Sequence, residues 1–265
     1  MLAEERYHVI INELEKNFSV KTADLCTKMQ VSRETIRRDL EELEKQGYVM
    51  RIHGGAKKVE TDHRPSSYVP FDERQVENLS DKEAVARLAA TLIKPNHCIA
   101  LDSGTTSLLL AKEIASLGYP VTVVTNSLAI ANELVNANQI TLVLTGGIYN
   151  GEERAFISDL STLIFSKINI DLFFLTTCGI SVEKGITYQR MDEVNTQLAM
   201  MQAATETIVI ADSSKIGVNS LVSMCSIQEV GRMITDTHIS EEQLQQFKAA
   251  GVTVLVAQEE GVLHE

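Results

Sequence analysis

The feature of the sequence that most constrains the fold is a helical pattern at the N-terminus that a tight turn interrupts. Apolar residues recur at helical spacing over residues 3–17 and again over residues 22–29. Gln30 and Val31 predict a tight turn, and Ser32 is a suitable N-cap for a third helix. A helix, a short helix, a turn and another helix in this order predict a helix-turn-helix unit.

The third helix separates an apolar stripe from its basic residues. Ile36, Leu40 and Leu43 recur at i, i+4 and i+7, and the arginines lie off that stripe or on its flanks. Two short strands around a turn are predicted over residues 48–55, which completes a winged helix-turn-helix. Such a helix can enter the major groove of DNA, and such a wing can approach the backbone or the minor groove. The residues expected to contact DNA are Ser32, Arg33, Thr35, Arg37, Arg38, Arg51 and His53.

The distribution of charge permits DNA binding although the whole chain is acidic. The chain has 24 basic and 36 acidic residues, but residues 1–60 contain 11 of each, so the excess of negative charge lies in residues 61–265. The N-terminal part can therefore bind DNA if its basic residues gather on one face. The alternative is a three-helix packing unit whose charged side chains are only solvated.

The rest of the chain alternates strand-like and helical segments. Residues 59–80 are rich in proline, serine and mixed charges and are expected to form a linker. From residue 81 to residue 265, the alternation predicts an α/β main domain with a mainly parallel sheet. The small N-terminal domain is placed at residues 1–58, with its helix-turn-helix at about residues 20–39. The predicted strands are residues 98–101, 121–124, 140–144, 172–175, 208–211, 233–234 and 252–256.

Small polar residues and glycines follow several of these strands, at the carboxyl ends where α/β sheets bind ligands. The segment Asp102–Thr106 also opens a helix, so it combines a glycine, hydroxyl groups and a helix start that favours anions. Each segment alone could be merely a strand-to-helix cap. Together they predict a site for a compact phosphorylated or polyhydroxy ligand. The residues expected to bind this effector are Asp102, Ser103, Gly104, Thr105, Thr106, Thr125, Asn126, Gly146, Gly147 and Lys215.

Two parts of the sequence resemble the DeoR family of bacterial transcriptional regulators. The string from Val31 to Ala56 matches that family's helix-turn-helix and wing in register, through T-I-R-R-D-L and R-x-H-G-G. The order D-S-G-T-T, T-N-S, G-G and D-S-S-K resembles the family's sensor domain, as does Phe71-x-x-Arg74 with Lys82. The resemblance therefore covers nearly the whole chain.

The resemblance implies a sensor domain similar to sugar-phosphate isomerases such as ribose-5-phosphate isomerase. It also implies that residues 103–106 hold a phosphate and that Lys215 lies nearby. Two segments depart from the family pattern. The stretch from Glu153 to Ser158 replaces a Gly-Pro-x-Ala-like stretch, and Gln197 stands where a lysine usually follows the acidic residue near Glu193. These departures leave the identity of the effector open.

The resemblance implies a DNA-binding transcriptional regulator, expected to be a repressor of a carbohydrate catabolism operon under the control of a phosphorylated sugar. The sequence does not decide whether the regulator represses or activates transcription. Two alternatives are a sugar-phosphate isomerase-like enzyme with an accessory DNA-binding module, and a nucleic-acid-binding structural protein without an effector. No set of nucleophile, base and orienting residue stands out, so enzyme activity is not expected. Palindromic half-sites in operator DNA favour a homo-oligomer, at least a dimer.

Other features indicate a cytoplasmic protein. No apolar run reaches the roughly 18 residues that a membrane span requires, and the N-terminus lacks the pattern of a secretion signal. Four scattered cysteines are expected to be reduced, and the six dispersed histidines show no metal-binding spacing. We therefore expect no metal, no cofactor and no contact with a membrane.

Overall fold

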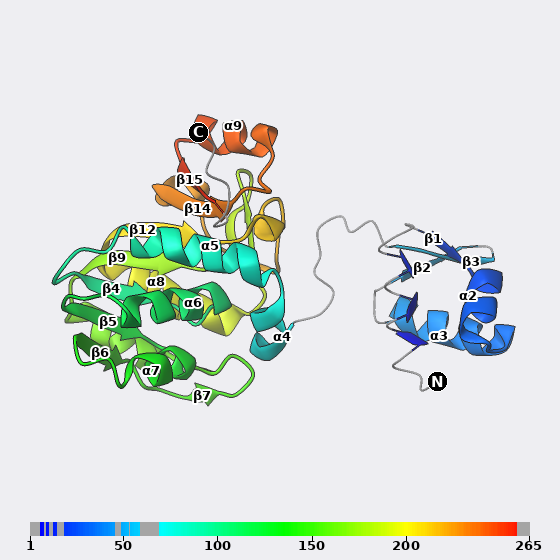
Figure 1. Cartoon of the computed structure of the whole chain (residues 1–265), viewed down its shortest axis with the longest axis horizontal. Coiled ribbons are helices and arrows are strands. Elements are labelled where there is room, and N and C mark those ends of the chain that lie inside the picture. The colour runs from blue at the N-terminus through cyan, green and yellow to red at the C-terminus, as the bar shows by residue number, and fades with distance from the viewer. Residues whose placement is uncertain are drawn as a thin grey trace. The chain divides into compact units, whose positions relative to one another are not determined.

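The computed structural model describes residues 6–7, 9–10, 13–14, 19–45, 49–52, 54–58 and 69–258. The chain divides into two compact units, Met1–Tyr68 and Val69–Glu265 (Figure 1). The predicted boundaries at residues 58 and 81 remain predictions. Within the described residues, every helix is too short or too polar to cross a bilayer.

The N-terminal unit contains the predicted winged helix-turn-helix. Helices α2 (Thr22–Met29) and α3 (Arg33–Lys45) precede the hairpin of β2 (Val49–Ile52) and β3 (Gly55–Lys58). Strand β1 (Ser19–Lys21), which the sequence did not predict, pairs with β3 in an antiparallel sheet of order β1-β3-β2. Most of the predicted first helix over residues 3–17 lies outside the described residues.

A small apolar core holds this unit together. The stripe of Ile36, Leu40 and Leu43 on α3 is buried against Leu25 and Met29 of α2. Other members of the core come from the N-terminal residues and from the small sheet, namely Ile10, Leu14, Val20, Val49 and Ala56. The apolar face of α3 is therefore buried in the core of this unit, and the opposite face is exposed to solvent.

The second unit is built on a sheet of seven strands that are all parallel, in the order β15-β14-β12-β9-β4-β5-β6. This confirms the predicted α/β class. The strands are β4 (Cys98–Leu101), β5 (Val121–Thr125), β6 (Ile140–Leu144), β9 (Ile170–Leu175), β12 (Ala204–Ile210), β14 (Arg232–Asp236) and β15 (Thr253–Ala257). Their near-continuous apolar character is typical of strands that are buried on both faces.

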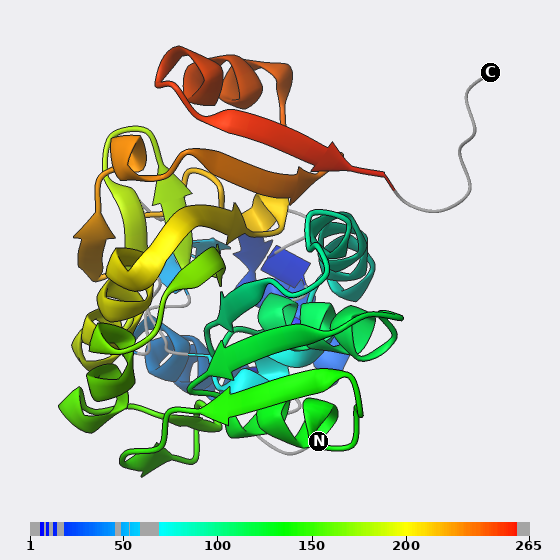
Figure 2. The ribbon, with the colours of Figure 1, turned by 90° about the vertical axis from the view of Figure 1, so that its left-hand side faces the viewer.

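Successive residues along the strands supply two separate apolar layers. On one face, Leu101 and Phe174 pack with α5 (Leu79–Ala90), α6 (Thr105–Ala115) and α7 (Leu128–Leu134). On the other face, residues such as Phe173 and Val209 pack with α8 (Met191–Ala203) and α9 (Glu241–Ala249). Figure 2 shows α9 beside β14 and β15 at one edge of the sheet.

Several smaller elements were not predicted from the sequence. A second antiparallel sheet has the order β10-β11-β13 and comprises β10 (Gly179–Ser181), β11 (Gly185–Tyr188) and β13 (Val222–Cys225). A short hairpin of β7 (Tyr149–Asn150) and β8 (Ala155–Phe156) follows β6. The 3-10 helices are η1 (Asp159–Ser166), η2 (Ser213–Lys215) and η3 (Ile227–Glu229).

The segment predicted as a linker contains ordered structure in its described part. Helix α4 (Phe71–Val76) and the start of α5 lie before residue 81, and the Phe71 side chain is buried in the core of the second unit. Prolines and mixed charges suggested a linker over this stretch, but the buried Phe71 side chain and the backbone hydrogen bond from Phe71 to Glu152 attach α4 to the second unit. Residues 59–68 lie outside the described residues.

Candidate functional site

The turn between α2 and α3 is set by a left-handed residue and a serine cap. Gln30 ends α2 with φ of 54°, and the backbone N–H of Val31 donates to the Cys26 carbonyl. Ser32 Oγ accepts from the backbone N–H of Thr35 at 3.1 Å and lies 2.8 Å from Thr35 Oγ1. Ser32 therefore caps α3, as its position predicted, and both hydroxyls lie at the start of the helix.

A buried ion pair anchors the inner side of α3. Arg6 donates from Nε and Nη2 to the two carboxylate oxygens of Asp39, at 2.7 and 2.8 Å. Asp39 is buried, and this fork geometry fixes both side chains. Asp39 therefore positions α3 and does not belong to its exposed face.

Two of the arginines predicted to contact DNA, Arg37 and Arg38, lie on the exposed face of α3, where carboxylates of the same helix pair with them. Arg37 donates to Glu34 at 2.8 and 2.9 Å and also to Glu41, while Arg38 donates to Glu34 at 3.2 Å. The Arg37 guanidinium lowers the pKa of Glu34 to about 2. Exposed ion pairs of this kind contribute little to stability. DNA phosphates can therefore replace the carboxylates as partners of the arginines at a small cost in free energy.

The wing is connected to the same carboxylates. On β2, the Arg51 guanidinium donates to Glu41 at 2.9 Å, and the Arg51 backbone N–H donates to Glu44 at 2.9 Å. Glu41 thus joins Arg51 to Arg37 of α3. Arg33 is exposed at the start of α3, and His53 lies outside the described residues.

In the second unit, Asp102 at the end of β4 is a fully buried organising residue. Its Oδ1 accepts from the backbone N–H of Gly104 at 3.2 Å and from Ser107 Oγ at 2.6 Å. Its Oδ2 accepts from the backbone N–H and the hydroxyl of Thr176, at 2.8 and 2.7 Å. Burial raises the pKa of Asp102, and these four donors oppose that shift. Asp102 therefore fastens the ends of β4 and β9 together.

The glycine in this loop makes room for another side chain. A Cβ on Gly104 would overlap the side chain of Thr176, and the backbone φ of Gly104 is −73°, which any residue can adopt. The sequence argument assigned this space to an approaching ligand. In the structure, the space is taken by Thr176.

The hydroxyls around Gly104 are better placed to meet a ligand. Ser103, Thr105 and Thr106 are buried, and their side chains form no hydrogen bond with any described residue. They lie at the start of α6, an 11-residue helix whose first N–H groups point toward its N-terminal end. This combination of hydroxyls and helix start can bind an anion.

The ends of β5 and β6 use their predicted residues mainly for local structure. Thr125 Oγ1 accepts from the backbone N–H of Ser127 at 3.0 Å. Asn126 Nδ2 donates to the Phe156 carbonyl at 3.1 Å, while its Oδ1 has no partner among the described residues. Gly146 and Gly147 have φ of 68° and 119°, and a Cβ on Gly147 would overlap serine side chains from the start of η1. Both glycines thus serve the turn.

Lys215 lies in a second group of polar residues, at the end of β12. Asp212 accepts from the backbone N–H of Ser214 at 3.2 Å and from Asn78 Nδ2 at 3.0 Å. Lys82 is buried and donates to the carbonyls of Arg74 and Glu77, at 2.6 and 2.7 Å. Burial lowers the pKa of Lys82, and so does the nearby charge of Lys215.

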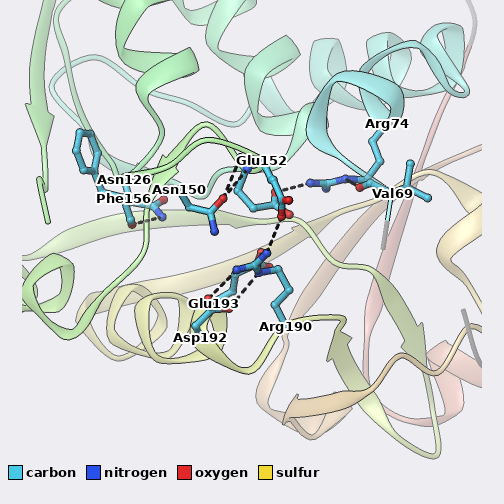
Figure 3. Close-up of polar contacts among 10 residues, drawn as sticks. Val69, Arg74, Asn126, Asn150, Glu152, Phe156, Arg190, Asp192 and Glu193 are labelled. Carbon is cyan, nitrogen blue, oxygen red and sulfur yellow. Dashed lines mark hydrogen bonds and ion pairs between the residues drawn. The ribbon is translucent and has the colours of Figure 1, made fainter. Parts of the chain in front are cut away.

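A third group of charged residues was not predicted from the sequence (Figure 3). Arg74 of α4 donates to Glu153 and, from Nε, to the Val69 carbonyl at 2.9 Å. Burial and the carboxylate of Glu153 raise the pKa of Glu193, which hydrogen-bonds to Glu153. Arg190 pairs with Asp192 at 2.8 Å and lies 3.6 Å from Glu193.

The sequence contained a signal for this third group. Arg74 lies in the Phe71-x-x-Arg74 match, and Glu153 begins a stretch that departs from the family pattern. Glu193, Thr196 and Gln197 also recur at helical spacing, so they form a polar stripe on α8 that the structure buries. The separation of 79 residues between Arg74 and Glu153 hid their contact.

Two other features lie among residues that were not predicted to bind the effector. Asp81, Asp236 and His238 bring possible metal ligands within 4.8 Å of one another. The Asp236 carboxylate, however, already accepts backbone N–H groups of Ser213 and His238, at 2.6 and 2.9 Å, so turn geometry explains the cluster. A cavity of about 350 Å³ is lined by residues 182–185 and 223–228, none of which is a predicted site residue.

The comparisons with known proteins agree with both units. Residues 6–62 match the DeoR-like helix-turn-helix domain, and residues 77–237 match the DeoR C terminal sensor domain. The HTH-type transcriptional regulator GolR of Listeria innocua is 32% identical over 96% of this chain and 98% of its own length. A putative aga operon transcriptional repressor of Escherichia coli O157:H7 is 33% identical over 96% and 94%, and the transcriptional repressor GlcR of Bacillus subtilis is 31% identical over 98% of both chains.

Solved structures show a more distant similarity. Ribose 5 phosphate isomerase A from Neisseria gonorrhoeae has a TM-score of 0.39 and 13% identity, over 52% of this chain and 53% of that chain. The delta subunit of eIF2B from Chaetomium thermophilum has a TM-score of 0.40 and 14% identity, over 59% and 58%. Because these scores are below 0.5, the assignment to a family rests on the sequence relatives.

Proposed function

Because the chain belongs to the DeoR family of transcriptional regulators, we propose that it represses a carbohydrate catabolism operon and that a phosphorylated sugar controls its binding to operator DNA. The proposal that an effector binds rests on the buried hydroxyls at the start of α6, which have no hydrogen-bond partner among the described residues. Relatives named as repressors of an aga operon and as GlcR support the carbohydrate half.

For DNA binding, we assign the reading of the major groove to the exposed face of α3. Arg33, Arg37 and Arg38 lie on this face, while the apolar stripe is buried in the unit's core. Arginine can bind guanine through paired hydrogen bonds, and it can also bind phosphate. Arg51 of the wing is assigned to the DNA backbone. We further propose a homo-oligomer, because two copies of α3 related by a two-fold axis match a palindromic operator.

For the effector, we assign the phosphate to Ser103, Thr105 and Thr106, with Lys215 as the nearby cation. The second unit is acidic overall, so an anion needs a local group of donors to bind there. Hydroxyls and helix N–H groups are such donors, and they are uncharged, so the site can bind the phosphate without a buried lysine or arginine. Asp102 fixes the conformation of this loop through its hydrogen bonds to Gly104, Ser107 and Thr176.

We also propose that the protein is not an isomerase. Asp102 is the buried carboxylate nearest to the phosphate loop in sequence, and both of its oxygens are taken up by internal donors. A catalytic acid or base needs access to a substrate proton. Turnover of a sugar phosphate by the purified protein would favour the enzyme alternative.

The test compares two variants beside the ends of α6 with the wild-type protein. Ser103→Ala removes a hydroxyl of the proposed phosphate site, and Ser116→Ala removes an exposed hydroxyl at the other end of α6. A panel of sugar phosphates is screened by thermal shift, and operator affinity is then titrated with and without the compounds that bind. We expect Ser103→Ala to lose most of the response and Ser116→Ala to keep it. Gly104→Val is unsuitable, because it would displace Thr176.

The result also bears on how the effector acts. A ligand changes operator affinity only if it binds the DNA-competent and DNA-incompetent states differently. A coupling of about 1–3 kcal/mol would change operator affinity by roughly 5- to 150-fold. An equal response in Ser103→Ala and wild type would show that this loop is only a helix start.

A further inference from the structure

The inner face of α8 carries buried oxygen atoms that have no hydrogen-bond partner in the part of the chain that the structure describes. They are Oγ1 of Thr196, Oε1 of Gln197 and Oε1 of Glu193, and Oδ1 of Asn126 at the end of β5 shares this property among the described residues. All four side chains are more than nine-tenths buried, with exposed fractions of 1, 2, 6 and 1%, respectively. Buried polar atoms in folded proteins are nearly always paired, so a group of four unpaired oxygens calls for a partner.

The structure brings these atoms toward one corner of the sheet. The Asn126 amide donates to the Phe156 carbonyl, and the same carbonyl accepts from Ser161 Oγ of η1 at 3.2 Å. Helix η1 packs along α8, and α8 packs against β9. At the start of α8, Glu193 is close enough to Glu153 for that carboxylate to raise its pKa, and Glu153 belongs to the segment that pairs with Asn126. Figure 3 shows Asn126, Phe156 and Glu193 in this region.

The chemistry of these atoms defines what can bind them. The amide oxygens of Asn126 and Gln197 can only accept hydrogen bonds, so their missing partners must be donors. The Thr196 hydroxyl can donate as well as accept, which suits a partner that does both. A phosphate group offers oxygens that accept, and the nearby Glu153 carboxylate, paired with Arg74, would repel it. The hydroxyl groups of a sugar donate and are uncharged. Arg190 lies 3.6 Å from Glu193, which is beyond hydrogen-bond reach.

We propose that Asn126, Glu193, Thr196 and Gln197 form the subsite that binds the hydroxyl groups of the effector's sugar. This inference rests on the proposed function, and it adds the orientation of the ligand. The phosphate points to the hydroxyls at the start of α6, and the sugar points to α8. Gln197 then determines which sugar is accepted, because its acceptor oxygen must meet a hydroxyl of the correct configuration. A site that recognises a hydroxyl strongly rejects a ligand that lacks it.

The test separates the two ends of the ligand. Gln197→Met removes the acceptor oxygen and keeps nearly the same volume, and Gln202→Met makes the same change on the exposed side of α8. The probes are inorganic phosphate, a panel of hexose and pentose phosphates, and the same sugars without phosphate. Dissociation constants are measured by calorimetry on the full chain, and circular dichroism verifies that each variant is folded.

We expect Gln197→Met to weaken binding of the tightest sugar phosphate by about tenfold, as the loss of one hydrogen bond to a buried acceptor implies. Inorganic phosphate should bind both variants and the wild type within about twofold, and Gln202→Met should match the wild type for every probe. Equal weakening of inorganic phosphate and sugar phosphate, or no weakening of either, would overturn the assignment.

A second variant gives a readout that needs no ligand. Thr196→Val replaces an unpaired buried hydroxyl with a methyl group of the same shape, so it should raise the melting temperature of the protein without ligand and weaken sugar binding. A lower melting temperature with unchanged sugar binding would mean that Thr196 has a structural partner. If sugars bind without phosphate and Gln197→Met weakens them, the subsite stands although the phosphorylated effector does not. If no probe binds the wild type, both proposals fail.

Discussion

Replacing Asp102 by asparagine tests whether this residue organises the sheet edge or touches the effector. Each carboxylate oxygen accepts one backbone N–H and one hydroxyl, from Gly104 and Ser107 on one side and from Thr176 on the other. An asparagine keeps one acceptor oxygen and presents an NH2 group in place of the second. Hydroxyls can turn to accept from that group, but one backbone N–H must lose its acceptor in either orientation of the amide.

The magnitude follows from that single orphaned donor. A buried N–H without an acceptor costs about 1–3 kcal/mol. For a unit of this size, a loss of about 2 kcal/mol lowers the melting temperature by about 4–8 °C. We therefore expect Asp102→Asn to destabilise the second unit by this amount and to leave operator affinity without effector close to that of the wild type.

The assay is urea denaturation of the full chain, followed by circular dichroism, together with operator titration by fluorescence anisotropy. A variant that unfolds at the same urea concentration as wild type, yet loses its response to the effector, would refute the positioning role. Asp102 would then contact the ligand directly, as the sequence alone suggested.

Three further predictions concern single residues. Arg38→Ala should keep the melting temperature and weaken operator binding. The loss should be about 1–3 kcal/mol if Arg38 contacts a base, whereas the salt slope should become smaller by about one if Arg38 contacts a phosphate. Anisotropy titrations at several salt concentrations distinguish the two cases. Lys215→Ala should weaken sugar-phosphate binding in calorimetry and leave binding of the unphosphorylated sugar unchanged, and an equal loss of both would remove Lys215 from the phosphate site. The folded state raises the pKa of Glu193 above its unfolded value, so wild-type stability should fall as pH rises from about 4.5 toward that raised pKa, with a slope of up to about 1.4 kcal/mol per pH unit. Glu193→Gln should remove this slope in urea denaturation at pH 5.5 and 7.5, and an unchanged slope would assign it to other groups.

Local patterns were enough to predict some elements and not others. The helix-turn-helix follows from periodicity, a serine cap and a turn that all fall within about 20 residues. Strand β1 has three residues, too few for any pattern to emerge, and it is formed by its pairing with β3. The same limit applies to β10, β11 and β13, whose contacts with one another define them.

The candidate site shows where the residue type misleads. Gly104 was correctly placed at the loop, but the reason for a glycine there is Thr176, which is 72 positions away in the sequence. Arg74, Glu153 and Glu193 are three surface-type residues from separate segments, namely α4, the turn between β7 and β8, and α8, and only the fold brings them together. Sequence reasoning could find strand ends because each is local, but it could not determine which polar atoms would be left without partners.

The carboxylates around the arginines that we propose to contact DNA affect how operator binding depends on salt concentration. In the proposed complex, phosphates displace Glu34 and Glu41 from Arg37 and Arg51. Two negative side chains are then left beside a polyanion, and they retain cations in the interface. Each phosphate neutralised by a protein contributes about −0.9 to the slope of log K against log salt for duplex DNA. The measured slope will therefore reflect the number of phosphates that arginines neutralise minus the number of cations that stay in the interface. It will be shallower than the slope expected from the number of basic contacts alone. The operator affinity of such a repressor falls less with rising salt concentration than its number of arginines implies.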